Sequence, residues 1–144
     1  MCDKESVILK IREVSNLMKR CAKDTIKQNH QYEVTSRHIF IAKYLYKNQH
    51  KDIFQKDIEE EFCIRRSTVT SILNLMEKNG IITRERVDYD ARLKKIVLTE
   101  KAKDIHNKNV SKIRAMEEMF LNGIDDEELK NFYKTLEKIK NNII

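Results

Sequence analysis

The sequence predicts a mainly α-helical protein with one small β-hairpin, and three observations support that prediction. Its 144 residues include only two glycines and no proline, while charged residues make up 36%. Such a composition favours helices joined by few loops. Large apolar residues recur every three or four positions through most of the chain, which is the helical period. A stretch rich in β-branched residues at 81–98 departs from that period and predicts two short strands.

The segment 64–80 has the pattern of a helix with one apolar face and one face of short polar side chains. The apolar residues follow the spacing i, i+3, i+4, i+7 and are Val69, Ile72, Leu73 and Met76. The polar residues on another face are Ser67, Thr70, Ser71, Asn74 and Lys78. Short hydrogen-bonding groups let a helix approach base edges closely, and arginine side chains reach guanine or phosphate.

We therefore interpret the helix from about Arg66 to Asn79 as a recognition helix for the major groove of double-stranded DNA. Its expected DNA-binding residues are Arg65, Arg66, Ser67, Thr68, Thr70, Ser71 and Asn74. The alternative reading is an ordinary amphipathic helix whose polar face meets only solvent.

A basic β-hairpin is predicted directly after this helix. Gly80 ends the helix, because glycine takes the left-handed conformation without steric cost. Strands are expected at Ile81–Val87 and Leu93–Leu98, joined by a turn at Asp88–Ala91. The basic residues of this hairpin are Arg84, Arg86, Arg92, Lys94 and Lys95. Two helices followed by a basic hairpin form a winged helix-turn-helix.

The helices before the recognition helix complete the predicted core. A helix at Phe54–Phe62 would be the first of the helix-turn-helix, with its turn at Cys63-Ile64. We expect Ile58 and Phe62 to be core residues rather than contacts. An earlier helix, capped by Thr35 or Ser36, has the apolar residues Ile39, Phe40, Ala42, Tyr44 and Leu45.

The excess positive charge lies on the predicted DNA-binding segment. The formal net charge of the chain is +6. Between Arg65 and Lys103 there are ten basic and five acidic residues, a net charge of +5. A basic composition spread evenly along the chain would explain the total but not this clustering.

Apolar seams with alternating spacings of three and four mark both ends of the chain. The N-terminal seam is Val7, Ile11, Val14, Met18 and Cys21, and the C-terminal seam is Leu129, Phe132, Leu136, Ile139 and Ile143. Between the hairpin and the last helix, a long helix is expected from Thr99 to Leu121, and Asp125 with Glu128 predicts a capping box after Gly123. Heptad-like seams favour dimerisation helices that pack against a partner chain, whereas packing within one chain is the alternative.

Other chemistry has little support in the sequence. We expect no catalytic residues, no metal ligands and no cofactor, because the four histidines are scattered and no glycine-rich phosphate loop is present. The apolar runs are too short and too charged for a membrane span or a secretory signal. Three widely separated cysteines suit free thiols in a reducing cytoplasm.

Several short motifs, taken in order, resemble the MarR family of bacterial transcription regulators. The matching residues are Gln55-Lys56-Asp57-Ile58, Arg66-Ser67-Thr68-Val69-Thr70, Glu77-Lys78-Asn79-Gly80-Ile81-Ile82-Thr83-Arg84, Asp90-Ala91-Arg92 and Val97-Leu98-Thr99. Each motif is short, but their order and spacing are specific. Ala102 departs from the pattern, because many members of the family have glycine there.

The resemblance implies roles for the wing and for the ends of the chain. Arg92 matches a wing-tip arginine that enters the minor groove, and Asp90 matches the carboxylate that holds it in place. Proteins of this family dimerise through their terminal helices, here 1–30 and 104–144, which flank a DNA-binding unit at 35–103 within a single domain, 1–144. A small aromatic or anionic ligand is also implied, bound between the dimerisation helices and the winged unit.

The predicted function is that of a homodimeric transcription regulator, more a repressor than an activator, on a pseudo-palindromic DNA operator. Two alternatives remain open. One is a thiol-based redox-responsive regulator that uses Cys21 or Cys63, the latter close to Arg65 and Arg66. The other is a winged helix that docks a protein, with the basic wing merely solvated.

Overall fold

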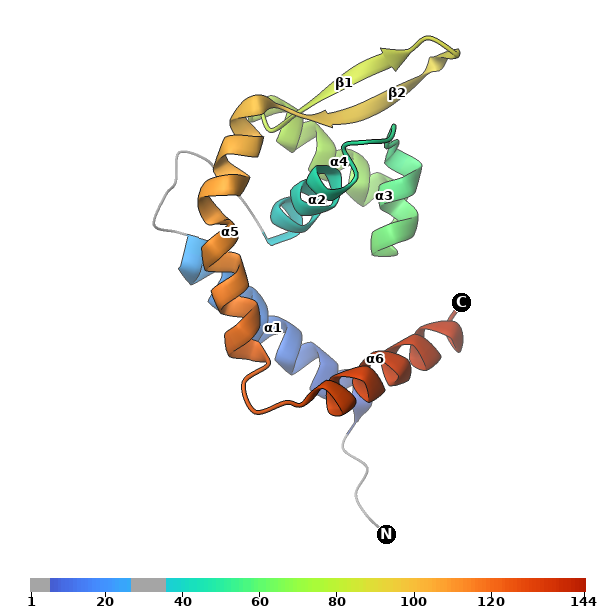
Figure 1. Ribbon diagram of the computed structural model, residues 1–144. Coiled ribbons are helices and arrows are strands. Elements are labelled where there is room, and N and C mark those ends of the chain that lie inside the picture. The colour runs from blue at the N-terminus through green and yellow to red at the C-terminus, as the bar shows by residue number, and fades with distance from the viewer. Residues whose placement is uncertain (1–5, 27–35) are drawn as a thin grey trace. The chain divides into compact units, whose positions relative to one another are not determined.

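The computed structural model describes residues 6–26 and 36–144, which form six α-helices and one two-stranded antiparallel sheet (Figure 1). The elements are α1 (Val7–Ile26), α2 (Ser36–Lys47), α3 (Gln55–Phe62), α4 (Arg66–Lys78), β1 (Ile82–Val87), β2 (Asp90–Leu98), α5 (Glu100–Phe120) and α6 (Asp126–Asn141). The chain divides into two compact units, one ending at Ser111 and one from Lys112 to Ile144. The prediction of a mainly helical winged helix-turn-helix fold is confirmed.

The core of the first unit lies where α2, α3 and α4 pack beneath the base of the hairpin. The four apolar residues predicted on one face of the recognition helix, from Val69 to Met76, are all buried. Ile58 of α3 is fully buried and Phe62 packs against the same cluster, as expected from the sequence. Other buried members of this cluster are Ile41, Leu45, Ile53, Ile82, Ile96, Leu98 and Ala102. Burying one face of α4 in this way fixes which face remains available to a ligand.

A tight turn joins α3 to α4. Cys63 ends α3 in the left-handed conformation (φ 50°, ψ 43°), which is uncommon for a residue other than glycine. The N–H of Ile64 donates to the Glu59 carbonyl at 3.1 Å and so closes the last turn of α3. At the other end, the Asp57 carboxylate accepts from the N–H of Phe54 at 2.7 Å, so the helix begins at Gln55, one residue later than predicted.

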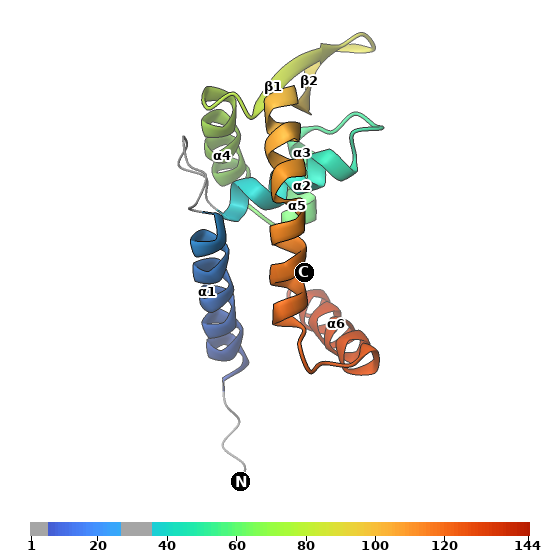
Figure 2. The same ribbon diagram turned by 60° about the vertical axis from the view of Figure 1, so that its left-hand side comes forward.

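The hairpin differs from its prediction at the tip. The return strand β2 begins at Asp90 rather than Leu93, because Asp90 pairs with Val87 across a turn formed by Asp88 and Tyr89. The next pair joins Arg86 to Lys94, so the register shifts between Arg86 and Val87 and leaves residues 91–93 without a paired position on β1. Such a bulge bends the strand and turns its side chains in new directions. Figures 1 and 2 show the hairpin projecting from α2, α3 and α4.

Two predicted helix caps are present. Thr99 precedes α5, and its hydroxyl oxygen accepts from the N–H of Ala102 at 3.2 Å. Asp125 precedes α6 and accepts from the N–H groups of Glu127 and Glu128, while Glu128 accepts from the N–H of Asp125, each at 2.9 Å. The cap predicted at Thr35 or Ser36 lies outside the described side chains.

Candidate nucleic-acid interface

The polar face of α4 faces solvent along the length of the helix. Arg65, Arg66, Ser67, Ser71 and Asn74 are exposed, and Thr68 and Thr70 are partly exposed. Since the opposite face of the helix is buried, these side chains are the ones that α4 can present to a ligand. All seven predicted residues of this segment are therefore at least partly accessible.

Intramolecular hydrogen bonds restrict the hydroxyl groups of this face. The hydroxyl of Thr70 donates to the Arg66 carbonyl at 2.9 Å and accepts from the amide of Gln55 at 2.8 Å. The hydroxyl of Ser71 donates to the Ser67 carbonyl at 3.1 Å. Since both protons are already donated to backbone carbonyls, these hydroxyls can act toward a ligand only as acceptors. Gln55 was not identified from the sequence as a functional residue, because it lies fifteen positions before Thr70 on a different helix.

Arg84 of β1 is turned toward α4 and not toward solvent. Its guanidinium forms an ion pair with the carboxylate of Glu77 and donates to the side-chain oxygen of Asn74 at 2.9 Å. Only 20% of the Arg84 side chain is exposed. The sequence predicts Arg84 as a DNA contact, but its guanidinium already has two partners on the recognition helix.

The wing presents three of the five basic residues predicted for it, whereas Arg84 and Lys95 form ion pairs with Glu77 and Asp52. Arg86, Arg92 and Lys94 are exposed, with Arg92 in the irregular part of β2. The Asp90 carboxylate accepts from the backbone N–H of Arg92 at 2.9 Å. Asp90 therefore fixes the backbone that bears the arginine and leaves the guanidinium available to a ligand.

Asp52, in the loop between α2 and α3, holds the hairpin from below. One carboxylate oxygen lies 3.2 Å from the Lys95 ammonium, and the other accepts from the Tyr89 hydroxyl at 3.1 Å. Partial loss of hydration, the hydrogen bond to Asp52 and the nearby carboxylates raise the pKa of Tyr89, so the phenol stays protonated and donates. The adjacent Ile53 carbonyl accepts from the N–H of Ile96 at 2.7 Å. The sequence gives no sign of these contacts, because the partners are 37 to 43 positions apart.

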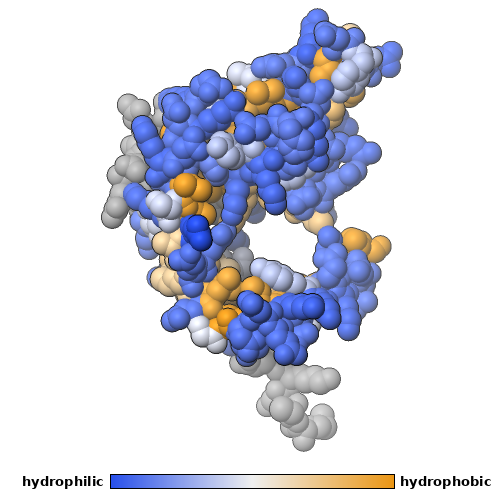
Figure 3. All heavy atoms as spheres, viewed as in Figure 1, coloured by the Kyte–Doolittle hydropathy of each residue, from blue (hydrophilic) through white to orange (hydrophobic). Residues whose placement is uncertain are grey.

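The surface over these elements is polar. Figure 3 shows hydrophilic residues covering most of the visible face of α2, α3 and α4 and much of the hairpin. Exposed apolar side chains there are Phe40, Leu75, Tyr89 and Leu93. A polar, basic face of this kind is suited to a charged ligand and not to an apolar one.

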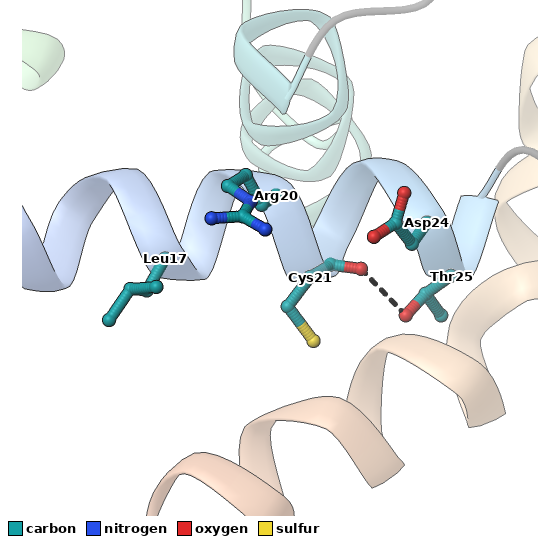
Figure 4. A pocket seen from close by; sticks show the side chains of 5 residues that line it. All are labelled: Leu17, Arg20, Cys21, Asp24 and Thr25. Carbon is teal, nitrogen blue, oxygen red and sulfur yellow. Dashed lines mark hydrogen bonds between the residues drawn. The ribbon is translucent and has the colours of Figure 1, made fainter.

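The two described cysteines differ in their surroundings. Cys63 is exposed, whereas Cys21 is partly buried on α1 beside a hollow of about 450 Å³ that is lined by Leu17, Arg20, Cys21, Asp24 and Thr25. Figure 4 shows Cys21 and Thr25 pointing to the same side of the helix, and the Thr25 hydroxyl donates to the Cys21 carbonyl at 2.9 Å. Among residues 6–26 and 36–144, no cluster of three or more His, Cys, Asp or Glu side chains could hold a metal ion, and no helix is long and apolar enough to span a membrane.

A helix-turn-helix with an exposed polar second helix, followed by a projecting basic hairpin, defines a winged helix-turn-helix protein. The sequence model of the MarR family matches residues 32–93, which span α2, α3, α4 and most of the hairpin. Over these residues the chain is similar to the MarR family of transcription regulators.

Solved structures with the same fold are similar over almost the whole chain. The transcription regulator MarR from Oenococcus oeni PSU-1 is 27% identical, with a TM-score of 0.81 over 94% of this chain and 99% of that one. The MepR–DNA complex of S. aureus is 24% identical, with a TM-score of 0.85 over 96% and 99% of the two chains. The transcriptional regulator SlyA is 18% identical, with a TM-score of 0.79 over 96% and 94%.

Proposed function

We propose that this protein is a homodimeric transcription repressor, acting in the cytoplasm, that binds a pseudo-palindromic operator in double-stranded DNA. The observation that best supports this proposal is the accessible face of α4, which has small hydrogen-bonding side chains between Arg66 and Asn74 and a buried opposite face. A helix with this surface fits the width and depth of the major groove and can approach base edges. The solved MepR–DNA complex has the same fold.

The wing supplies the second part of the proposed DNA contact. Its exposed basic residues Arg86, Arg92 and Lys94 lie on a hairpin that projects beyond the helices (Figure 2). A narrow minor groove concentrates negative potential and attracts an inserted guanidinium. We assign that insertion to Arg92, with Asp90 fixing the backbone of the wing tip.

Exposed apolar residues support the proposed dimer. In the first unit, Val7, Ile11, Val14 and Met18 are exposed along α1. In the second unit, Phe132 and Ile143 are exposed and Leu129, Leu136 and Ile139 are partly exposed. Burying such surfaces against a second copy removes apolar area from water, and two-fold symmetry places two recognition helices about 34 Å apart, one helical turn of DNA.

A small aromatic or anionic ligand would regulate this repressor by favouring a dimer that fits DNA less well. The hollow on α1 supports such a site, because the apolar side chain of Leu17 and the guanidinium of Arg20 line it together. Benzoate, as the probe, should raise the midpoint of thermal unfolding of the wild type and lower its affinity for DNA. Arg20→Gln should reduce both effects. If benzoate changes neither the unfolding midpoint nor the DNA affinity of the wild type, the proposal of an aromatic anion as ligand is wrong.

Selection of bound sequences from randomised duplexes tests the proposed function. We expect a two-fold-symmetric motif, with affinity that falls by orders of magnitude between about 50 and 200 mM salt as phosphate contacts release counterions. Binding that is absent, or that does not respond to salt, would instead favour a protein-docking role. Cys21→Ser and Cys63→Ser should leave DNA binding intact, whereas wild-type binding that is lost on oxidation and preserved in either variant would favour the redox alternative.

A further inference from the structure

We propose that Arg84 is a positioning residue that fixes the side-chain amide of Asn74 in one orientation, so that Asn74 reads an adenine in the major groove. This inference rests on the proposed function, because it concerns how the recognition helix reads a base. It also changes the role expected of Arg84, from a direct DNA contact to a group that orients one.

The geometry joins three side chains from two elements. Asn74 and Glu77 lie three positions apart on α4 and share a face of that helix. Arg84 reaches them from β1, with one guanidinium nitrogen on the Glu77 carboxylate and another 2.9 Å from the Asn74 oxygen. The ion pair with Glu77 limits the rotation of the guanidinium. The Arg84 side chain is only 20% exposed, so most of it is covered by neighbouring residues.

The chemistry of arginine settles the orientation of the Asn74 amide. A guanidinium has five N–H donors and no acceptor. The atom of Asn74 that meets it must therefore be the carbonyl oxygen Oδ1, and the amino group Nδ2 must point the other way. Asn74 is exposed, and within the described part of the chain Nδ2 has no hydrogen-bond acceptor. Both N–H groups of Nδ2 are thus available to an external ligand.

An amide held in this way matches one base edge in particular. Nδ2 can donate to N7 of adenine, while the second lone pair of Oδ1 accepts from the N6 amino group. Cytosine offers only an amino donor in the major groove, so it leaves Nδ2 without a partner. An asparagine free to turn over would lose part of this discrimination, since its oxygen and nitrogen would exchange places.

Arg84 is poorly suited to a phosphate contact. Its charge is already balanced by Glu77, and a phosphate would have to displace a carboxylate from a guanidinium that is mostly covered. Arg86 is two residues further along the same strand and on the same face, but it is exposed, and its side chain has no hydrogen-bond or ion-pair partner among the described residues. Arg86→Met is therefore a matched control for Arg84→Met, with the same loss of charge and donors.

Sequence selection with the dimeric wild type and its variants tests the inference. The wild type should select adenine at one symmetry-related pair of positions, with a preference of about 5- to 150-fold over cytosine. Asn74→Ala should abolish that preference at this pair alone. Arg84→Met should reduce it at the same pair, with little additional effect when combined with Asn74→Ala. Arg84→Lys should restore most of it, because an ammonium also offers only donors.

The control Arg86→Met and the variant Asn74→Asp distinguish a phosphate contact from a residue that orients Asn74. Arg86→Met should weaken all sequences alike and leave the adenine preference unchanged. Asn74→Asp should change the preference at this pair from adenine to cytosine, because an aspartate oxygen can accept from the N4 amino group. This variant keeps Arg84, so it also tests the inference if Arg84→Met does not fold, as judged by circular dichroism.

Five results would overturn the inference. Arg84→Met could weaken every sequence equally and lower the salt dependence, which would make Arg84 a phosphate contact. Its effect could instead add fully to that of Asn74→Ala, or Asn74→Asp could still select adenine. A wild type that selects no motif at all would overturn the proposed function as well, whereas a wild-type motif that is unaltered in Arg84→Met would overturn this inference alone.

Discussion

The side chain of Arg92 makes no hydrogen bond or ion pair within the described part of the chain. It is exposed, and the contact at this residue is made by its backbone N–H to the Asp90 carboxylate. Replacing Arg92 by alanine should therefore remove a DNA contact without removing an internal one. A residue of this kind separates binding from stability more cleanly than one that also packs in the core.

For Arg92→Ala we expect at least about a 10-fold loss of affinity for the selected duplex, as is typical when a specific minor-groove contact is removed. The midpoint of thermal unfolding and the sedimentation coefficient should match those of the wild type. Fluorescence anisotropy with a labelled duplex measures the affinity. If the variant binds as tightly as the wild type, or unfolds at a clearly lower temperature, the wing tip is assigned wrongly.

The role of a residue was predictable from the sequence only where it depends on the spacing of nearby residues in the chain. Val69 and Met76 repeat at helical spacing and are buried as predicted, because periodicity fixes which side of a helix faces the core. The partners of Arg84 and Thr70 were not predictable. Both bonds join elements that are separate in the sequence, so they depend on how those elements pack.

At the scale of elements, the position of the hairpin depends on a loop outside it. Asp52 lies in the α2–α3 loop and contacts the hairpin at two points, Lys95 of β2 and Tyr89 of the turn. The Lys95–Asp52 pair is about one-third exposed, so it contributes little to overall stability, at most about 1 kcal/mol. We expect its main effect to be on the direction in which the wing projects.

Asp52→Asn should lower affinity for the selected duplex several-fold, because the wing loses its ion pair and presents Arg92 less uniformly. Loss of a negative charge near DNA would, by itself, strengthen binding. Asp88→Asn is the matched control: this exposed carboxylate of the hairpin turn has no partner in the described part of the chain, so its removal should leave affinity equal or higher. Equal affinities for the two variants, measured by anisotropy titration, would show that Asp52 does not position the wing.

Element boundaries were predicted closely where capping chemistry is local. Thr99 and Asp125 precede their helices as expected, since a cap is made within three or four residues. The start of β2 was predicted three residues late. Asp90 looks like a turn former in sequence, but pairing with Val87 and the bulge that follows bring it into the strand.

For the molecule as a whole, the buried histidine of α2 makes stability depend on pH. Burial lowers the pKa of His38 below its ordinary value of 6.5, so the folded state holds the imidazole neutral. As the pH falls through 6.5, the unfolded chain gains this proton first, and the free energy of unfolding decreases. Above 6.5 the contribution of His38 to stability is fully present. Burial and the nearby Lys43 lower the pKa of His106 in the same direction.

Urea unfolding at pH 7.5 and 5.5 should therefore show a larger loss of stability in the wild type than in His38→Gln. His50 is exposed in the turn after α2, so His50→Gln serves as the control and should keep the wild-type pH dependence. The comparison uses the difference between the two pH values, and a lower absolute stability of His38→Gln does not affect it. A pH dependence unchanged in His38→Gln would contradict this assignment.

The fold and the similarity to the MarR family were predictable at this scale, because the order of motifs from Gln55 to Thr99 is a property of the sequence itself. The proposed dimer, the operator and the ligand concern molecules other than this chain. Within this chain, the exposed apolar residues of α1 and α6 are the observation that supports the proposed dimer.

Hydroxyl-radical footprinting of the selected duplex tests most directly whether two winged units bind one double helix. The wild type should protect two symmetry-related sets of sugars about one helical turn, or roughly 10 base pairs, apart, and Arg92→Ala should lose the protection assigned to the minor groove. A duplex cleaved uniformly at saturating protein, or protected over a single unsymmetrical stretch, would contradict the account.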